Sequence, residues 1–281
     1  MAAFHFCNNM HILVDIGGTK TRVAASRDLE SFDKPQIFST QTKYEAGIVT
    51  IVESAKKLAK GEVIERISVG APGVITPNHQ SLLTSPNLPD WKGKAIGGDI
   101  ESAVGAKVHV ENDTALVGLG EALYGAGVGA TTVMYLTVST GVGSVRIVDG
   151  KIDAPYRSAE IGHMYFNSSG ELQKFMSLVS GKTIQQRFGM APKELGKDHA
   201  VWEELARIVA IGVHNSILHW TPDRVILGGS MFNEIGISVE RVRAHLSEIM
   251  KAFPKIPEIV HSSLGDVGGL WGGMARLKQL R

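Results

Sequence analysis

Cysteine is almost absent from this chain, which has a single one, Cys7, among its 281 residues. One thiol cannot build a disulfide framework, and it cannot supply the ligands of a cysteine-rich metal site. Chains that fold without disulfides are typical of reducing compartments. We therefore expect a cytoplasmic protein.

An excess of charge of one sign and long apolar runs are also lacking. The 29 lysines and arginines balance 28 aspartates and glutamates, and no basic block occurs, which argues against a nucleic-acid partner. No stretch approaches the ~20 apolar residues of a membrane span. The first residues lack the basic start and apolar run of a signal peptide. The composition is that of a globular chain with one large domain or two medium ones.

Glycine, in contrast, is abundant, with 32 residues that gather at turns. Strand and helix patterns alternate along the chain, which favours α/β layers. A strand, a glycine turn and a second strand occur at 11–26 and recur at 133–148, which predicts two halves built on one plan. The other expected elements are a helix at 47–61, strands at 65–74 and 224–230, a strand and helix within 106–127, and a last helix at 268–281. We expect the boundary between the halves near residues 112–129 and a ligand cleft between them.

The first glycine turn carries several residues suited to anion binding. Backbone N–H groups in such a turn form a nest for phosphate oxygens. A hydroxyl, a charged amine and a carboxylate that suits hydrated Mg²⁺ accompany the glycines. These residues are Asp15, Gly17, Gly18, Thr19 and Lys20. The alternative is a plain tight hairpin with a solvated lysine.

Two further turns repeat this chemistry. The segment 138–144 adds the hydroxyls of Ser139 and Thr140, and its recurrence favours phosphate binding over a plain hairpin. Gly228 and Gly229 form a third turn, of a type that accepts an adenine or a ribose. Two common nucleotide motifs are absent. The spacing G-x-G-x-x-G does not follow the first strand, and "SGKT" at 180–183 lacks the P-loop glycine, since Met176 stands there.

Asp113 is the candidate base. It lies at the start of an expected helix, where the helix dipole favours an ionised carboxylate by roughly 0.3–1 kcal/mol. A carboxylate there can accept a hydroxyl proton during phosphoryl transfer. The alternative is that Asp113 or Asn112 only caps the helix.

Glu160 and His163 form a second candidate group. A carboxylate and an imidazole three residues apart suit a polyhydroxyl ligand, which needs several donors and acceptors together. They also suit part of a metal site, although no further Cys/His cluster lies near them in the sequence. A third possibility is a surface glutamate beside a satisfied histidine.

Taken together, these motifs resemble the ROK family of sugar kinases and repressors, within the actin-like ATPase superfamily. The likeness runs in the family's order through eight segments along nearly the whole chain. They are "DIGGTKTRVA", "SVGAPGVI", "SPNLPDWKG", "VENDTALVGLGEALYGAG", "LTVSTGVGSVRIVDGKI", "AEIGH", "VILGGSM" and "LGDVGGLWGGMA". The resemblance implies a two-lobed α/β fold of the ribonuclease H-like type. The small lobe would span 1–115 with the last helix, about 268–281, and the large lobe 116–267.

The resemblance also implies roles for individual residues. ATP phosphates and Mg²⁺ would lie against the first turn, with Asp15 as the Mg²⁺ residue, and against a second set, which comprises Thr137, Ser139, Thr140, Gly141 and Gly143. The nucleoside would lie near Gly228 and Gly229. The sugar pocket would contain Gly70, Ala71, Pro72, Gly73, Asn87, Asn112, Asp113, Glu160 and His163. A homodimer is implied as well.

The chain departs from the family at one place. Most ROK kinases follow the Glu-x-Gly-His segment with a cysteine-rich loop, which binds zinc and ends in a sugar-contacting glutamate. Residues 164–183 contain no cysteine, so we expect no zinc site there. Met176 stands where the glutamate is expected, and Glu171 or Gln173 would have to substitute for it.

The sequence therefore predicts an ATP-dependent kinase that phosphorylates a hexose or a hexose derivative at the 6-hydroxyl, with Asp113 as base. The missing glutamate leaves a second hypothesis, a sugar or nucleotide sensor of the same fold with little or no activity. A third is a sugar-responsive repressor. It is disfavoured because the first phosphate strand begins near residue 11 and leaves no room before it for a DNA-binding module.

Overall fold

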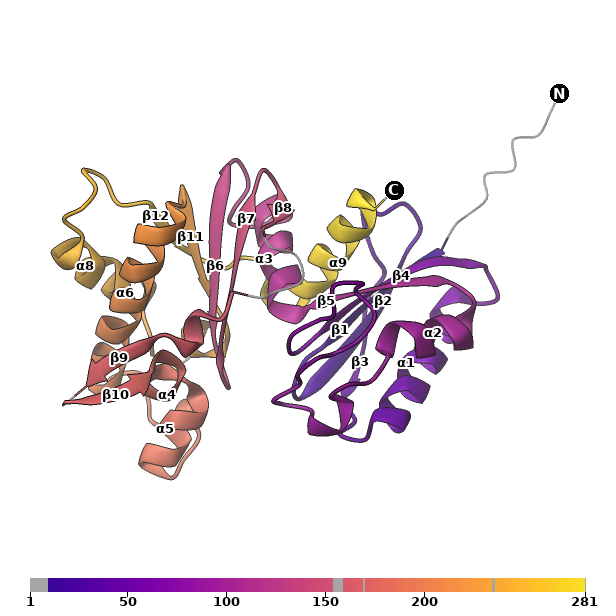
Figure 1. Cartoon of the computed structure of the whole chain (residues 1–281), viewed down its shortest axis with the longest axis horizontal. Helices are drawn as coiled ribbons and strands as arrows, with labels where there is room; N and C mark the ends of the chain where they lie inside the picture. The colour runs from indigo at the N-terminus through magenta and orange to yellow at the C-terminus, as the bar shows by residue number, and fades with distance from the viewer. Residues whose placement is uncertain (1–9, 154–158, 169, 234–235, 281) are drawn as a thin grey trace. The chain divides into compact units, whose positions relative to one another are not determined.

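The computed structural model describes residues 10–153, 159–168, 170–233 and 236–280, and Cys7 lies outside these ranges (Figure 1). The chain forms two compact units. Unit 1 contains residues 10–120 and 266–280, and unit 2 contains residues 121–265 of the described chain. No helix among the described residues is long and apolar enough to cross a membrane.

Unit 1 is built on a five-stranded sheet with the order β3-β2-β1-β4-β5. Its strands are β1 (Met10–Ile16), β2 (Lys20–Ser26), β3 (Gln36–Ser39), β4 (Ile64–Ala71) and β5 (Lys107–Asn112). The first three form an antiparallel meander, and β4 and β5 run parallel to β1. The strands expected in this part of the sequence are confirmed. β4 ends immediately before Pro72, which has no N–H group to donate to a sheet.

The helices of unit 1 cover both faces of this sheet. They are α1 (Tyr44–Ala59), α2 (Ile96–Val104), α9 (Gly268–Gln279) and the first part of α3 (Asp113–Tyr124). Ile51 of α1 and Ile100 of α2 are buried in one apolar core with strand residues such as Val69. The last helix, α9, packs against β1 and β4 from the opposite face (Figure 1).

Unit 2 repeats the sheet plan. Its five strands, in the order β12-β11-β6-β7-β8, are β6 (Thr132–Val138), β7 (Val142–Val148), β8 (Lys151–Ile152), β11 (Arg224–Gly228) and β12 (Glu258–His261). Again three strands form an antiparallel meander and two more run parallel to the first of them. The recurrence expected from the sequence is thus a property of the fold.

The remaining elements of unit 2 surround that sheet. The hairpin strands are β9 (Tyr165–Ser168) and β10 (Glu171–Lys174). The helices are α4 (Phe175–Val179), α5 (Gly181–Phe188), α6 (Val201–Trp220), α7 (Ser230–Asn233) and α8 (Val239–Ile249). Short 3₁₀ helices occur at 89–91, 161–163, 192–194 and 265–267. The core of unit 2 lies where α6 and α8 meet the sheet, with Trp202 and Val213 fully buried.

Candidate functional site

Three adjacent parallel strands of unit 1 bring candidate residues to one edge of their sheet. In the β1–β4 register Asp15 pairs with Gly70, and in the β4–β5 register Ala71 pairs with Asn112. All of these residues lie at the carboxyl ends of their strands, which is where open α/β sheets bind ligands. Asp113 follows directly as the first residue of α3. Local patterns that are far apart in the sequence therefore converge in unit 1.

Asp15 is a strongly perturbed acid. It is 8% exposed, and one oxygen lies 3.6 Å from a nitrogen of Arg22. Burial raises the pKa of Asp15 to about 7, the negative charge of Asp113 adds to this effect, and Arg22 opposes it. Gly269 at the start of α9 lies so close that a Cβ there would come within 2.8 Å of the Asp15 carboxyl carbon. A buried carboxyl with too little positive charge around it suits a cation.

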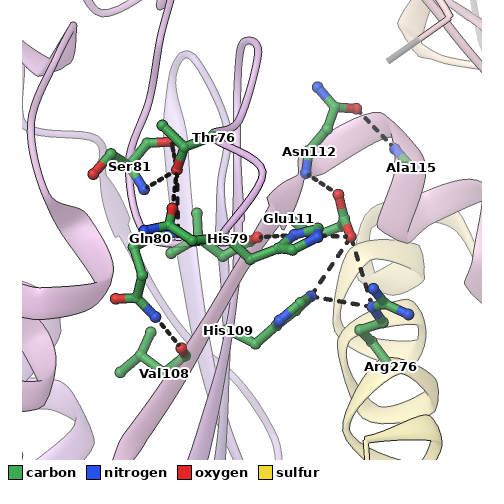
Figure 2. Close-up of polar contacts among 12 residues, drawn as sticks. Thr76, His79, Gln80, Ser81, Val108, His109, Glu111, Asn112, Ala115 and Arg276 are labelled. Carbon is green, nitrogen blue, oxygen red and sulfur yellow. Dashed lines mark hydrogen bonds and ion pairs between the residues drawn. The ribbon is translucent and has the colours of Figure 1, made fainter. Parts of the chain in front are cut away.

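Asn112, rather than Asp113, caps helix α3. The Asn112 side-chain oxygen accepts a hydrogen bond from the N–H of Ala115 at 2.9 Å (Figure 2). Its amide nitrogen donates to the carbonyl of Gly73 at 3.0 Å. Asp113 instead accepts from the N–H of Thr114 at 2.7 Å. Of the two capping residues that the sequence left open, Asn112 is therefore the cap. Asp113 is the first residue of the helix.

The first glycine turn joins β1 to β2 and is tied to β3. The N–H of Gly17 donates to the carbonyl of Lys20 at 2.9 Å, and the hydroxyl of Thr40 donates to the carbonyl of Gly17 at 2.7 Å. Gly18, Thr19 and Lys20 are exposed. The side chain of Asn87 lies beside Gly18, since a Cβ on Gly18 would be 3.6 Å from that of Asn87. The turn therefore has an anchored base and an open tip.

The second and third glycine turns meet inside unit 2. A Cβ on Gly229 would lie 2.4 Å from the Thr137 hydroxyl and 2.4 Å from the Val138 carbonyl. Gly229 also has a φ of +93°, a conformation that L side chains rarely adopt. The N–H of Ser139 donates to the carbonyl of Gly141 at 2.9 Å. Thr140, between them, is exposed, and Gly143 pairs with Thr137 across β6 and β7.

The residues expected to contact a sugar in unit 2 lie around a short 3₁₀ turn. A carboxylate oxygen of Glu160 lies 4.0 Å from His163 Nε2, and both side chains are about half exposed. The ammonium of Lys174, on β10, lies 3.2 Å from His163 Nδ1. Met176 packs beside the glycines of this region, with its Cβ 3.5 Å from where a Cβ of Gly162 would be. This part of the site therefore contains a lysine and a methionine close to the histidine.

Some residues of these sites were not identified from the sequence. Arg22 and Gly269 contact Asp15, and Asp266 accepts a hydrogen bond from Arg22 at 2.8 Å. Arg22 had a signal, because it lies opposite Asp15 in the antiparallel register of β1 and β2. Asp266 and Gly269 lie in the segment "LGDVGGLWGGMA", which the family resemblance includes, but no local pattern relates residue 269 to residue 15. The "SGKT" segment has a local role, because the Ser180 hydroxyl caps α5 by accepting from the N–H of Thr183 at 3.3 Å.

These residues fit Mg²⁺ and a nucleotide phosphate chain. Asp15 offers the hard oxygen ligand that Mg²⁺ prefers, and its raised pKa shows that a nearby cation would relieve an unfavourable charge. The tip of the first turn presents the exposed backbone of Gly18, with the Asn87 side chain beside it. Both kinds of donor, the Asp15 carboxylate and the backbone of the first turn, belong to unit 1.

Comparisons with known proteins agree with this picture. The model of the ROK family matches residues 11–279. A glucokinase of Thermotoga maritima is 26% identical over 312 residues, which cover 95% of this chain and 96% of the relative. An N-acetyl-D-glucosamine kinase of Vibrio parahaemolyticus is 27% identical over 298 residues, which cover 94% of this chain and 98% of the relative.

Solved structures extend the likeness to the fold. The crystal structure of a ROK family glucokinase from Streptomyces griseus, in complex with glucose and AMPPNP, superposes with a TM-score of 0.81 at 23% identity. The match covers 96% of this chain and 100% of that one. The α/β fold class expected from the sequence is thereby confirmed.

Proposed function

Because this chain belongs to the ROK family, we propose that it is an ATP-dependent sugar kinase that phosphorylates a hexose or a hexose derivative. The relatives at 26% and 27% identity are kinases of glucose and of N-acetyl-D-glucosamine. The observation that carries the proposal is a pair of acids at one edge of the sheet of unit 1. Asp15 lies on β1 and Asp113 directly follows β5, with β4 between these strands, and an open glycine turn follows β1. Such a set serves phosphoryl transfer, which depends on charge neutralisation and positioning.

Asp113 is the proposed base. It orients the attacking hydroxyl of the sugar, which we assign to carbon 6, and accepts the hydroxyl proton as the new bond to phosphorus forms. Asn112 caps α3 by accepting from the N–H of Ala115, and the Asp113 carboxylate accepts from the neighbouring N–H of Thr114. The first turn of a twelve-residue helix is a rigid place for a base.

The glycine turns are the proposed phosphate site. Phosphate binding is assigned to backbone N–H groups at the tips of the turns, at 18–19 in unit 1 and at 140–141 in unit 2, and Asp15 holds Mg²⁺, directly or through water. Gly228 and Gly229 receive the nucleoside. Bound Mg·ATP supplies the transferable phosphoryl group and part of the charge neutralisation.

The proposed sugar ligands follow from the family resemblance. Glu160 and His163 bind ring hydroxyls, as does Asn112. Gly70, Ala71, Pro72, Gly73 and Asn87 line the pocket. Met176 offers no hydrogen bond, so recognition at its position is weaker than an acidic residue would give.

An ADP-release assay tests the proposal. The chain is mixed with ATP, Mg²⁺ and a panel of hexoses, hexosamines and N-acetylhexosamines, and sugar-dependent ADP is measured. We expect Asp113→Asn to lower kcat by about 10²- to 10⁴-fold, as expected for loss of a general base. Asp153→Asn is the matched control, since Asp153 forms a surface ion pair with Arg146 at 2.8 Å. Undiminished turnover in the Asp113 variant would refute the assigned base.

The alternative, a sensor, has its own signature in the same experiment. Calorimetry would show binding of a sugar or a nucleotide by the wild-type chain, and no sugar would release ADP. The observation that favours this alternative is Met176, which cannot replace a carboxylate.

Two coarser expectations complete the proposal. A cytoplasmic location is supported by the near absence of cysteine. A homodimer is supported by the family alone, and light scattering of the purified chain would test it.

A further inference from the structure

A histidine–glutamate cluster, defined by His79, His109 and Glu111, lies in unit 1. His109 and Glu111 are two residues apart on β5 and so point to the same face of the sheet. His79 belongs to the segment that follows β4, and its carbonyl accepts a hydrogen bond from the N–H of Val110 at 3.0 Å. The two imidazole rings stack with their centres 4.3 Å apart (Figure 2).

Glu111 is the unusual member of this cluster. It is 1% exposed, and only one of its carboxylate oxygens is satisfied, by the N–H of Asn112 at 3.2 Å. The other oxygen, Oε2, is buried and accepts no hydrogen bond from the described residues. Leaving a buried acceptor without a partner costs about 1–3 kcal/mol, and more for a charged group. Figure 2 shows this oxygen directed into the cluster.

The distances around this oxygen are those of a metal site. Glu111 Oε2 lies 3.6 Å from His79 Nδ1 and 3.6 Å from His109 Nε2. These separations are too long for hydrogen bonds. Two donors bound tetrahedrally to one zinc ion at about 2.1 Å lie about 3.4 Å apart. One ligand atom from each of the three residues lies within 4.8 Å of the others.

The protonation of the histidines also suits a metal. Arg276 on α9 donates from Nε to His109 Nε2 at 3.1 Å, so this nitrogen is unprotonated and its lone pair accepts the hydrogen bond that a metal would replace. His79 Nδ1 also lies 3.0 Å from the Val110 carbonyl. When Nδ1 donates its proton to that carbonyl, Nε2 is the His79 nitrogen left to bind a metal.

We propose that His79, His109 and Glu111 together bind one divalent transition-metal ion, for which zinc is the best match. Two imidazoles and a carboxylate are ligands that zinc accepts, and three protein ligands leave one position for water. The ion takes the place of the Arg276 guanidinium, which otherwise supplies positive charge 3.6 Å from Glu111 Oε2.

Zinc titration of the chelator-treated full-length chain, followed by calorimetry, tests this proposal. We expect one ion per chain, and an affinity at least about 10-fold lower in His109→Ala and in Glu111→Gln. Arg276→Gln should bind about 10-fold more tightly, because a hydrogen-bonded competitor for the same atoms is removed. His245→Ala is the matched control, since His245 pairs with Glu203 at 2.7 Å in unit 2.

Several outcomes would overturn the site. These are no binding by the wild-type chain, equal binding by the Glu111 and His109 variants, or loss of binding in the His245 control. Cobalt(II) provides a second readout, with visible bands from nitrogen and oxygen ligands expected. A thiolate-to-cobalt band would assign the ion to Cys7 instead. A β5 variant that does not fold will fail to show cooperative unfolding. In that case His79→Ala is measured in its place, because His79 lies in the segment after β4 and not in a strand.

Discussion

The Asp15 carboxyl illustrates how one residue at the proposed site opposes folding. Its pKa rises from 3.8 to about 7, chiefly through burial. Between these two values the unfolded chain has released the proton and the folded chain still holds it. The free energy of unfolding contributed by this group therefore falls as the pH rises through that window, and the loss is complete above pH 7.

We accordingly predict that Asp15→Asn is more stable than the wild-type chain at pH 8 in magnesium-free buffer. The advantage should grow by about 1 to 3 kcal/mol between pH 5 and pH 8, because asparagine does not titrate. Urea denaturation at the two pH values measures it. Asp153→Asn serves as the surface control. A difference between Asp15→Asn and wild type that is the same at both pH values would contradict the raised pKa.

Among single residues, the sequence identified Asp15, Asn112 and Asp113 because each lies at or directly after the end of an apolar strand. It did not identify Glu111 as exceptional, although Glu111 immediately precedes Asn112. A glutamate in a strand is ordinary until the tertiary structure buries it and brings His79 and Arg276 beside it.

The turn after β11 requires a glycine at position 229. Gly229 has a φ of +93°, and its missing Cβ leaves room for the Thr137 hydroxyl and the Val138 carbonyl. A hydroxyl can rotate away, but a backbone carbonyl cannot move without displacing the end of β6. The close approach thus holds the second and third glycine turns together.

We predict that Gly229→Ala destabilises unit 2 by about 2 to 4 kcal/mol, from backbone strain and overpacking together. It should also raise the KM for ATP if the proposed phosphate site is correct. Gly196→Ala is the matched control, because Gly196 has a φ of +77° with nothing within 4 Å of its missing Cβ. That variant should lose only about 1 kcal/mol. Equal losses in urea denaturation would show that the contacts of Gly229 are unimportant.

For the chain as a whole, the last helix belongs to the first unit. Leu270 and Met274 of α9 are fully buried, and a Cβ on Gly272 would collide with the carbonyl of Leu116 at 1.7 Å. Unit 1 is therefore complete only after the last residues of the chain have been made. Unit 2 is formed entirely from the sequence between them.

A truncated chain that ends at Val267 tests this division. We predict that the amides of β1 and β4 lose protection from hydrogen exchange, because α9 no longer covers that face of the sheet. The amides of β6 and β11 should keep theirs. A chain that ends at Gln279 is the control, since it retains the whole of α9. Protected β1 and β4 amides in the shorter chain would contradict the assignment of α9 to unit 1.

The sequence by itself determined the alternation of strands and helices, the two glycine hairpins, and the polar residues that end the strands. It could do so because hydrophobic period, glycine and helix start signals are local. Only the tertiary structure decided that Asn112 caps α3, that Gly269 presses on Asp15, and that Arg276 meets the histidine–glutamate cluster. Those facts depend on contacts between segments more than a hundred residues apart, or on a choice between two adjacent side chains, and no local pattern records either.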